Sequence, residues 1–159
     1  FSGRRDSVLR FSSNSHFDCL LGLFAALLVP MSGVVTQGVE PDHPALDIAC
    51  RVGRPVRAAH DGVGRSRWTS THGWTFHLAG DGIKTRYSHL NVGAPAGSYD
   101  RGQIIGLCGN TGRWSTGPHL HFEAEPLHFL DALESPSADQ LKSMEQTPQW
   151  RQRSVEASR

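Results

Sequence analysis

Between about residues 29 and 126, Gly and Pro recur every few residues, and the apolar runs between them stay short. Glycine and proline interrupt regular structure, so these runs fit strands and turns better than long helices. We expect strands at 48–52, 74–78, 83–90, 104–107 and 120–124, because each apolar run is bounded by turn residues. No long run with a helical period of 3.6 residues lies between them. The sequence therefore predicts a mainly β domain, with antiparallel strands in a two-sheet sandwich or a barrel-like hybrid.

The segments on either side of this region differ from it in composition. Residues 1–28 combine three arginines with most of an uninterrupted apolar run of 11 residues at 19–29. The run is shorter than the ~20 residues that cross a bilayer, but it fits the apolar part of a secretory signal. We expect residues 1–28 to be a signal peptide or a membrane-anchor leader, with a buried helix or strand as the alternative. Residues 29–127 form the folded domain, and residues 128–159 are predicted to be a flexible tail after a short helical segment.

Charge and cysteine content exclude some classes of function. The formal net charge is +1 and no Lys/Arg run is present, which argues against nucleic-acid binding. The three cysteines include no CxxC pair, so a thiolate zinc knuckle is not expected. Cys50 and Cys108 could meet in space, although we expect two buried small apolar residues. Histidine stands out with nine copies, which makes these positions the first place to look for chemistry.

Two histidines lie two residues apart in the last predicted strand. Side chains at i and i+2 project from the same face of a strand, so His119 and His121 point together and Glu123 follows them. Leu120 and Phe122 then point the other way, into the core. Two imidazoles on one face can offer nitrogen ligands to a single metal ion.

A carboxylate completes the candidate ligand set. His43 and Asp47 lie four residues apart and share a face on a strand as well as on a helix, and Pro44 argues against a helix at this point. One Asp and two His give mixed nitrogen and oxygen donors, the pattern of a catalytic zinc site that keeps a fourth position open. His89 and the remaining histidine of the 119/121 pair are suited to general-base or electrostatic work near neutral pH. We expect Tyr87 and His89 to share one strand face.

Three motifs in this order resemble a known enzyme family. They are H-x-x-x-D at 43–47, Y-x-H-L at 87–90 and G-P-H-L-H-F-E at 117–123. The chain resembles the lysostaphin-like (LytM-type) zinc metallo-endopeptidases of bacterial cell walls, and the resemblance covers about residues 29–126. It extends to the segments at 30–36, 52–59, 102–106 and 109–112.

The resemblance implies a role for each site residue. His43, Asp47 and His121 correspond to the ligands of one zinc ion, His119 to the general base, and His89 to a residue that orients water or stabilises the tetrahedral intermediate. It implies a peptidoglycan peptide as substrate, with cross-links or bridges hydrolysed outside the cytoplasm: in the periplasm, in the cell envelope or after secretion. The apolar segment at 19–29 is a possible membrane tether. The sequence does not indicate the oligomeric state.

Other interpretations are open. Some relatives have lost metal ligands and act as non-catalytic activators of cell-wall amidases, whereas this chain keeps all of these residues. A lipoyl-type carrier would need a lysine on an exposed hairpin, and neither Lys84 nor Lys142 has that setting. For the remaining histidines we expect no direct role in the chemistry: His60 is solvated in a turn, and His72, His77 and His128 match no ligand spacing. Trp74 and Trp114 are expected to be packing residues, with the lining of a substrate groove as the alternative.

Overall fold

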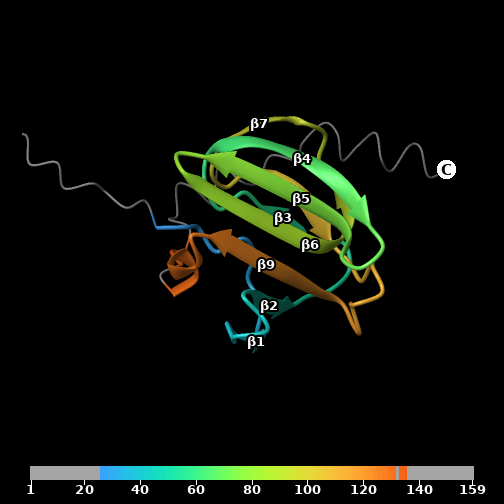
Figure 1. Ribbon diagram of the computed structural model, residues 1–159. Helices are drawn as coiled ribbons and strands as arrows, with labels where there is room; N and C mark the ends of the chain where they lie inside the picture. The colour runs from blue at the N-terminus through green and yellow to red at the C-terminus, as the bar shows by residue number, and fades with distance from the viewer. Residues whose placement is uncertain (1–25, 132, 136–159) are drawn as a thin grey trace, which may run out of the picture.

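The computed structural model describes residues 26–131 and 133–135, and Figure 1 shows how its strands are arranged. Most of the predicted leader (1–25) and most of the predicted tail (136–159) lie outside the described residues. The described part contains these elements: β1 (Val35–Gln37), β2 (Leu46–Ala49), β3 (Pro55–Arg57), β4 (Gly62–Thr69), β5 (Gly73–Gly80), β6 (Ile83–Gly93), β7 (Gly97–Tyr99), β8 (Ile104–Cys108), β9 (His119–Glu125) and the 3-10 helix η1 (Leu127–Asp131).

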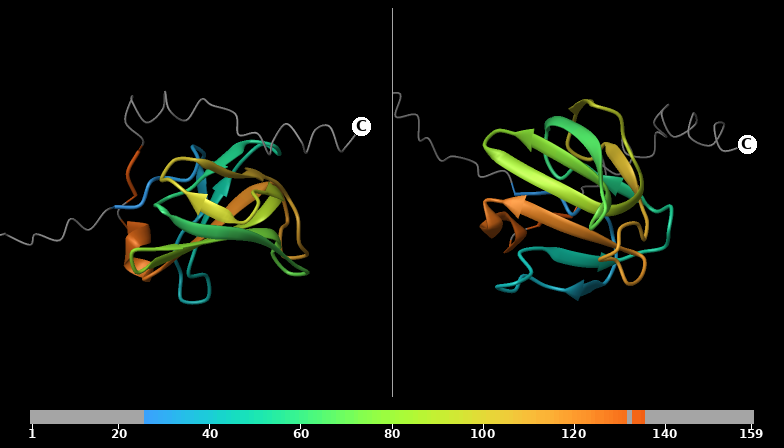
Figure 2. Two further views of the ribbon diagram at one scale, coloured as in Figure 1. Left: turned by 90° about the horizontal axis from the view of Figure 1, so that it is seen from above. Right: turned by 45° about the vertical axis from the view of Figure 1, so that its right-hand side comes forward.

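The strands form one continuous antiparallel sheet in the order β1-β2-β9-β6-β5-β4-β7. The sheet branches along β6, where residues 84–88 pair with β9 and residues 90–93 pair with β8. β8 pairs in turn with β3, so these two strands form a second layer behind the curved main sheet (Figures 1 and 2). The predicted mainly β class is confirmed.

Side-chain alternation places the core between these layers. β9 alternates buried and half-buried residues along its length, with Leu120 and Phe122 fully buried. The ring of Phe122 packs against Tyr87, which also contacts Phe76, with ring centroids 5.1 and 6.3 Å apart. Burying a side chain of this size stabilises a fold by roughly 1.5–3 kcal/mol. The opposite face of β9 carries His119 and His121 and is left free for polar residues.

Strand β4 lies where no strand was expected, because its sequence lacks an apolar run. It pairs with β5 from Val63–Ala79 to Thr69–Gly73, so backbone hydrogen bonds hold it in the sheet. Arg65 is exposed, whereas Gly64 is buried against the ring of Phe76. A Cβ atom at Gly64 would lie 2.5 Å from that ring, so the close packing requires glycine here.

Both ends of the described part pack onto the domain. Leu27 and Leu28, which fall in the predicted leader, are fully buried, and the Leu28 amide donates to the carbonyl of Ala59 at 2.9 Å. Glu134 pairs through its backbone with residues 27–29, and Leu130 of η1 is buried. Residues 26–28 and the described residues 128–131 and 133–135 are therefore in contact with the folded domain. Within the described ranges, no helix has the length and apolar content needed to cross a membrane.

Two expectations about buried groups were wrong. Cys50 and Cys108 form a disulfide rather than two separate thiols, because the end of β8 lies beside the residue that follows β2. His60 was expected to be solvated but is only 6% exposed. Its Nε2 lies 3.0 Å from the hydroxyl of Thr85. Thr85 belongs to β6, so this strand lies against the turn that carries His60.

Candidate metal centre

His43 and Asp47 come together at the start of β2. The Nδ1–H of His43 donates to the carbonyl oxygen of Gly38 at 2.9 Å, so its Nε2 keeps the lone pair. This Nε2 is buried and lies 3.3 Å from Asp47 Oδ1, yet it has no hydrogen-bond partner among the described residues. Leaving a buried polar atom unpaired is costly. A cation held between the two side chains would satisfy both.

His121 completes this group from the neighbouring strand. Asp47 of β2 and His121 of β9 face each other directly in the sheet, and His121 Nδ1 lies 2.8 Å from Asp47 Oδ1. On the other side of the ring, Nε2 lies 2.9 Å from Glu123 Oε1. One ligand atom from each of His43, Asp47 and His121 fits within 4.8 Å of the others, so these residues could hold one metal ion. Their mixed nitrogen and oxygen donors suit zinc.

His119 and His89 flank the group without belonging to it. The Nδ1–H of each donates to a backbone carbonyl at 2.8 Å, from His119 to Gly117 and from His89 to Thr111. Each Nε2 is therefore left with a lone pair. The two rings lie 4.7 Å apart, and His119 Nε2 is 3.6 Å from Asp47 Oδ2. The two rings thus present proton acceptors at the edge of the candidate metal centre.

The backbone at His89 corrects one expectation. Tyr87 and His89 were expected to share a strand face, but Tyr87 packs against Phe122 in the core while His89 lies beside His121. His89 has a positive φ of 63°, which is rare for a residue other than glycine. This conformation occurs where β6 changes partner from β9 to β8, and it turns the imidazole to the opposite face. Such strain is typical of functional positions.

Charges within the group are strongly coupled. Burial alone would raise the pKa of Asp47, but the hydrogen bond with His121 and the charges of the neighbouring histidines lower it. Burial alone would lower the pKa of His121, but the hydrogen bonds with Asp47 and Glu123 raise it to about 9. Burial lowers the pKa of His89 to about 4. Without a metal, a cationic His121 therefore lies between two carboxylates, and His89 is neutral at pH 7.

The structure also brings His72 to the centre, which sequence spacing did not indicate. Its ring stacks on His89 at 5.9 Å and lies 5.7 Å from His121. His72 lies in the hairpin loop between β4 and β5, where no local pattern predicts its neighbours. Trp114 meets His72 edge-on at 4.9 Å and is 60% exposed, and Trp74 is 39% exposed. Both tryptophan rings therefore reach solvent, while Trp74 also packs edge-on against Trp68.

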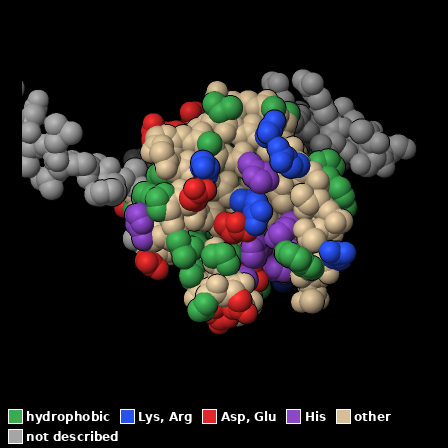
Figure 3. Space-filling model, viewed as in Figure 1, with side chains coloured by type: hydrophobic (Ala, Val, Ile, Leu, Met, Phe, Trp, Pro, Cys, Tyr) green, Lys and Arg blue, Asp and Glu red, His purple; other side chains and the backbone are tan. Residues whose placement is uncertain are grey.

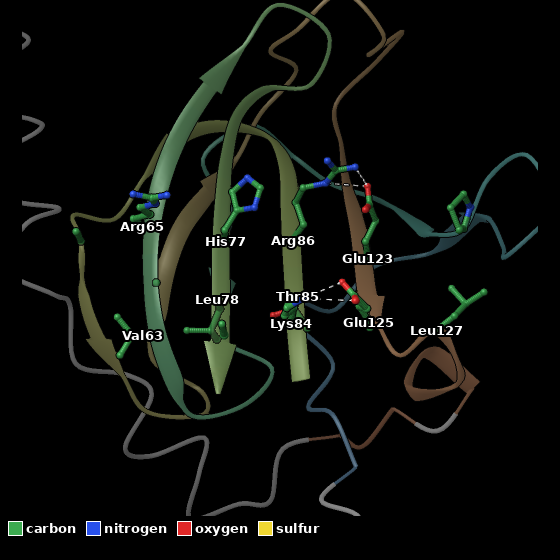
Figure 4. Close-up of a pocket in the computed structure, with 15 residues that line it drawn as sticks. Val63, Arg65, His77, Leu78, Lys84, Thr85, Arg86, Glu123, Glu125 and Leu127 are labelled. Carbon is green, nitrogen blue, oxygen red and sulfur yellow. Dashed lines mark hydrogen bonds and ion pairs between the residues drawn. The ribbon is translucent and has the colours of Figure 1, made fainter. Parts of the chain in front are cut away.

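A groove continues from the candidate metal centre across the outer face of the sheet. It has a volume of about 740 Å³ and extends from Pro44 and Glu123, next to the centre, to Arg65 on β4 (Figure 4). Figure 3 shows the histidines gathered on this face, with basic side chains above them over β4 to β6. An extended chain lying in the groove would pass beside His121.

Comparison with known proteins identifies this arrangement. Residues 41–129, more than half of the chain, match the model of Peptidase family M23. The chain belongs to peptidase family M23. The match contains the ligand candidates, His89 and His119, and it confirms the resemblance found in the sequence.

Individual M23 relatives support the same assignment. Peptidoglycan DD-endopeptidase ShyA of Vibrio cholerae is 41% identical over 95 residues, which is 56% of this chain and 21% of that protein. Glycyl-glycine endopeptidase ALE-1 of Staphylococcus capitis is 39% identical over 88 residues, which is 52% of this chain and 24% of that protein. The crystal structure of a putative M23 peptidase from Pseudomonas aeruginosa superposes with a TM-score of 0.54 at 28% identity, covering 61% of this chain and 43% of that one. The chain thus spans less than a quarter of the length of ShyA and of ALE-1.

Proposed function

We propose that this domain is a zinc-dependent endopeptidase that hydrolyses peptide cross-links or bridges of bacterial peptidoglycan. The observation that carries the proposal is the convergence of His43 Nε2, Asp47 Oδ1 and His121 Nδ1 on one half-buried point. Membership of the M23 family and the peptidoglycan endopeptidase named among its relatives support it.

We assign His43, Asp47 and His121 as the ligands of one zinc ion per chain. The Nε2 of His43 has its lone pair free, because the Nδ1–H of the same ring donates to the carbonyl of Gly38. The Nδ1 of His121 would offer its lone pair once it has lost its proton, because Nε2 donates to the carboxylate of Glu123. Zinc in a site with three protein ligands supplies Lewis acidity, which activates water and polarises a carbonyl.

We assign His119 as the general base. Its Nε2 has a lone pair, and its Nδ1–H is fixed by the Gly117 carbonyl. It can therefore take a proton from an attacking water and pass it to the leaving amine. His89 has its proton on Nδ1 as well, and its low pKa keeps it neutral at pH 7. Its Nε2 lone pair can accept a hydrogen bond from the attacking water and so orient it toward the substrate.

We also propose that the domain acts outside the cytoplasm, in the periplasm, in the cell envelope or after secretion. The disulfide between Cys50 and Cys108 supports this location, because structural disulfides persist mainly in oxidising compartments. The predicted leader at residues 1–28 points the same way. Fractionation of cells that express the full-length gene tests it, and a wholly cytosolic domain would contradict it.

Digestion of purified peptidoglycan tests the activity itself. The zinc-loaded protein should release fragments in which mass spectrometry detects one new amino terminus and one new carboxyl terminus per cut, and a chelator should abolish the release. The matched control is His121→Ala, which removes a proposed ligand. Binding of peptidoglycan without any release would instead favour the non-catalytic alternative.

A further inference from the structure

Four side chains cross the groove in one straight row. Arg65 of β4 faces His77 of β5, His77 faces Arg86 of β6, and Arg86 faces Glu123 of β9 in the sheet register. Figure 4 shows all four on the outer face of the sheet. Glu123 is hydrogen-bonded to His121, so the row begins at the candidate metal centre and ends at Arg65.

The charges along this row do not balance. Arg86 is bound to Glu123 through Nε at 2.9 Å, and in the next row Lys84 is paired with Glu125 at 3.4 Å. Arg65 is exposed and has no ion pair among the residues that the structure describes. The groove therefore carries an unpaired cation at the end away from the metal centre.

His77, in the middle of the row, does not add to this charge. Burial lowers its pKa first, and Arg86, Arg67 and Arg65 lower it further, against the opposing effect of Glu123. Arg67 projects from the same face of β4 as Arg65, two residues further along the strand. β4 contains no acidic residue and contributes Val63, Gly64 and Arg65 to the groove, so Arg65 is the charged side chain of this wall.

The spacing of the strands sets the length of peptide that reaches Arg65. Neighbouring strands lie about 4.8 Å apart, so three steps from β9 to β4 amount to roughly 14 Å. An extended peptide covers about 3.3–3.6 Å per residue, so about four residues span this distance. The reach of the arginine side chain shortens the span to two or three residues.

We propose that Arg65 is a specificity-determining residue that binds a free carboxylate of the substrate, two to four residues from the scissile bond. The preferred substrate is then an acidic stem peptide, and a glycine bridge, which has no charged side chain, is disfavoured. The inference rests on the proposed peptidase function, since it concerns the substrate of the same site. An arginine suits this role because its guanidinium can pair with a carboxylate through two parallel hydrogen bonds.

The test uses cross-linked peptides that differ only in charge. One carries free carboxylates, the second carries carboxamides at the same positions, and the third is an uncharged glycine peptide. We expect kcat/KM to be about tenfold higher for the carboxylate peptide than for the carboxamide peptide, because one charge-assisted hydrogen-bonded pair contributes a difference of this size. Arg65→Gln should abolish this preference through KM, with kcat on the amidated peptide and the zinc content unchanged.

Three further measurements separate the charge from other effects. Arg65→Lys should restore part of the preference, because it keeps the charge and loses the bidentate geometry. Arg54→Gln is the matched control; Arg54 is an exposed arginine outside the groove that bonds to Ser32, and its loss should leave the preference intact. Higher ionic strength should reduce the preference of the wild-type enzyme.

Two results would overturn the role of Arg65: equal kcat/KM for the acidic and amidated peptides, or an equal loss on both in Arg65→Gln. Equilibrium binding of the same peptides to the chelator-treated protein gives a second readout that does not need turnover. If no peptide is cut, the proposed activity fails, and the ratio of the two dissociation constants still decides the role of Arg65.

Discussion

His121 and Glu123 lie two residues apart on β9, with His121 Nε2 2.9 Å from Glu123 Oε1. The same carboxylate oxygen accepts a hydrogen bond from Arg86 Nε at 2.9 Å. Because the carboxylate is ionised, it holds a proton on Nε2, so the proton that a metal ion would displace is the one on Nδ1, which faces Asp47. Glu123 thereby selects which nitrogen of His121 is available for a metal ion.

Glu123→Ala should weaken zinc binding by about 10- to 100-fold, the usual cost of losing a carboxylate that orients a metal-bound histidine. Glu123→Gln should lose less, since its amide oxygen still accepts from the ring. The measurement is competition for zinc with a chelator of known affinity. Glu125→Ala is the control on the same strand, because Glu125 is exposed and pairs with Lys84. Equal zinc affinity in Glu123→Ala and the wild-type protein would disprove the orienting role.

The two histidines of the 119/121 pair should separate metal binding from turnover. His121→Ala removes a proposed ligand, so zinc and activity should be lost together. His119→Ala should keep its zinc while turnover falls by roughly 10²–10⁴, the range for loss of a general base. His89→Ala should resemble His119→Ala. Zinc content measured beside turnover tests all three, and loss of zinc from His119→Ala with retention in His121→Ala would reverse the assignment.

Zinc binding should release a proton at neutral pH. In the metal-free protein the pKa of His121 is raised to about 9, so the ring is protonated at pH 7 and must lose this proton to bind the ion. Zinc affinity should therefore rise with pH up to about 9 and then level off. Calorimetry in buffers of different ionisation enthalpy measures the number of protons released, and no release from His121 at pH 7 would contradict the raised pKa.

The same raised pKa predicts how the stability of the metal-free protein depends on pH. The pKa of His121 is higher in the folded protein than its ordinary value of 6.5, so its contribution is complete below that value and is lost as pH rises through about 9. Thermal unfolding of chelator-treated protein between pH 6 and pH 9.5 should show this decline. His121→Asn should flatten the curve, and a wild-type stability that rises across this window would be inconsistent with the coupling of His121 to Asp47 and Glu123.

Breaking the disulfide should lower the free energy of unfolding. Cys50 and Cys108 are separated by 58 residues, and closing a loop of this length stabilises a fold by about 4 kcal/mol in the chain-entropy model. The double variant Cys50→Ser/Cys108→Ser should therefore unfold at lower urea concentration than the wild-type protein. Cys19→Ser is the control, and a reducing agent that leaves the wild-type midpoint unchanged would show that the bond contributes nothing.

The sequence by itself determined the strand-based class and indicated the candidate site residues. The spacing of His119 and His121 placed both on one face because alternation along a strand is a local property of the backbone. The four-residue separation of His43 and Asp47 placed these two side chains on one face for the same reason. Turn residues at the ends of short apolar runs indicated β5, β6, β8 and β9, because such runs bury one or both faces of a strand.

Only the tertiary structure decided the features that depend on pairing between distant segments. β4 has no apolar run, and pairing with β5 makes it a strand and places Arg65 at the end of the groove. His89 departs from strand alternation because β6 changes partner there, and the positive φ turns its ring toward His121. His72 reaches the same cluster from a hairpin loop, and Cys50 meets Cys108 from another strand. Residue spacing reports contacts along one element, whereas these contacts follow from how the sheet branches and curls.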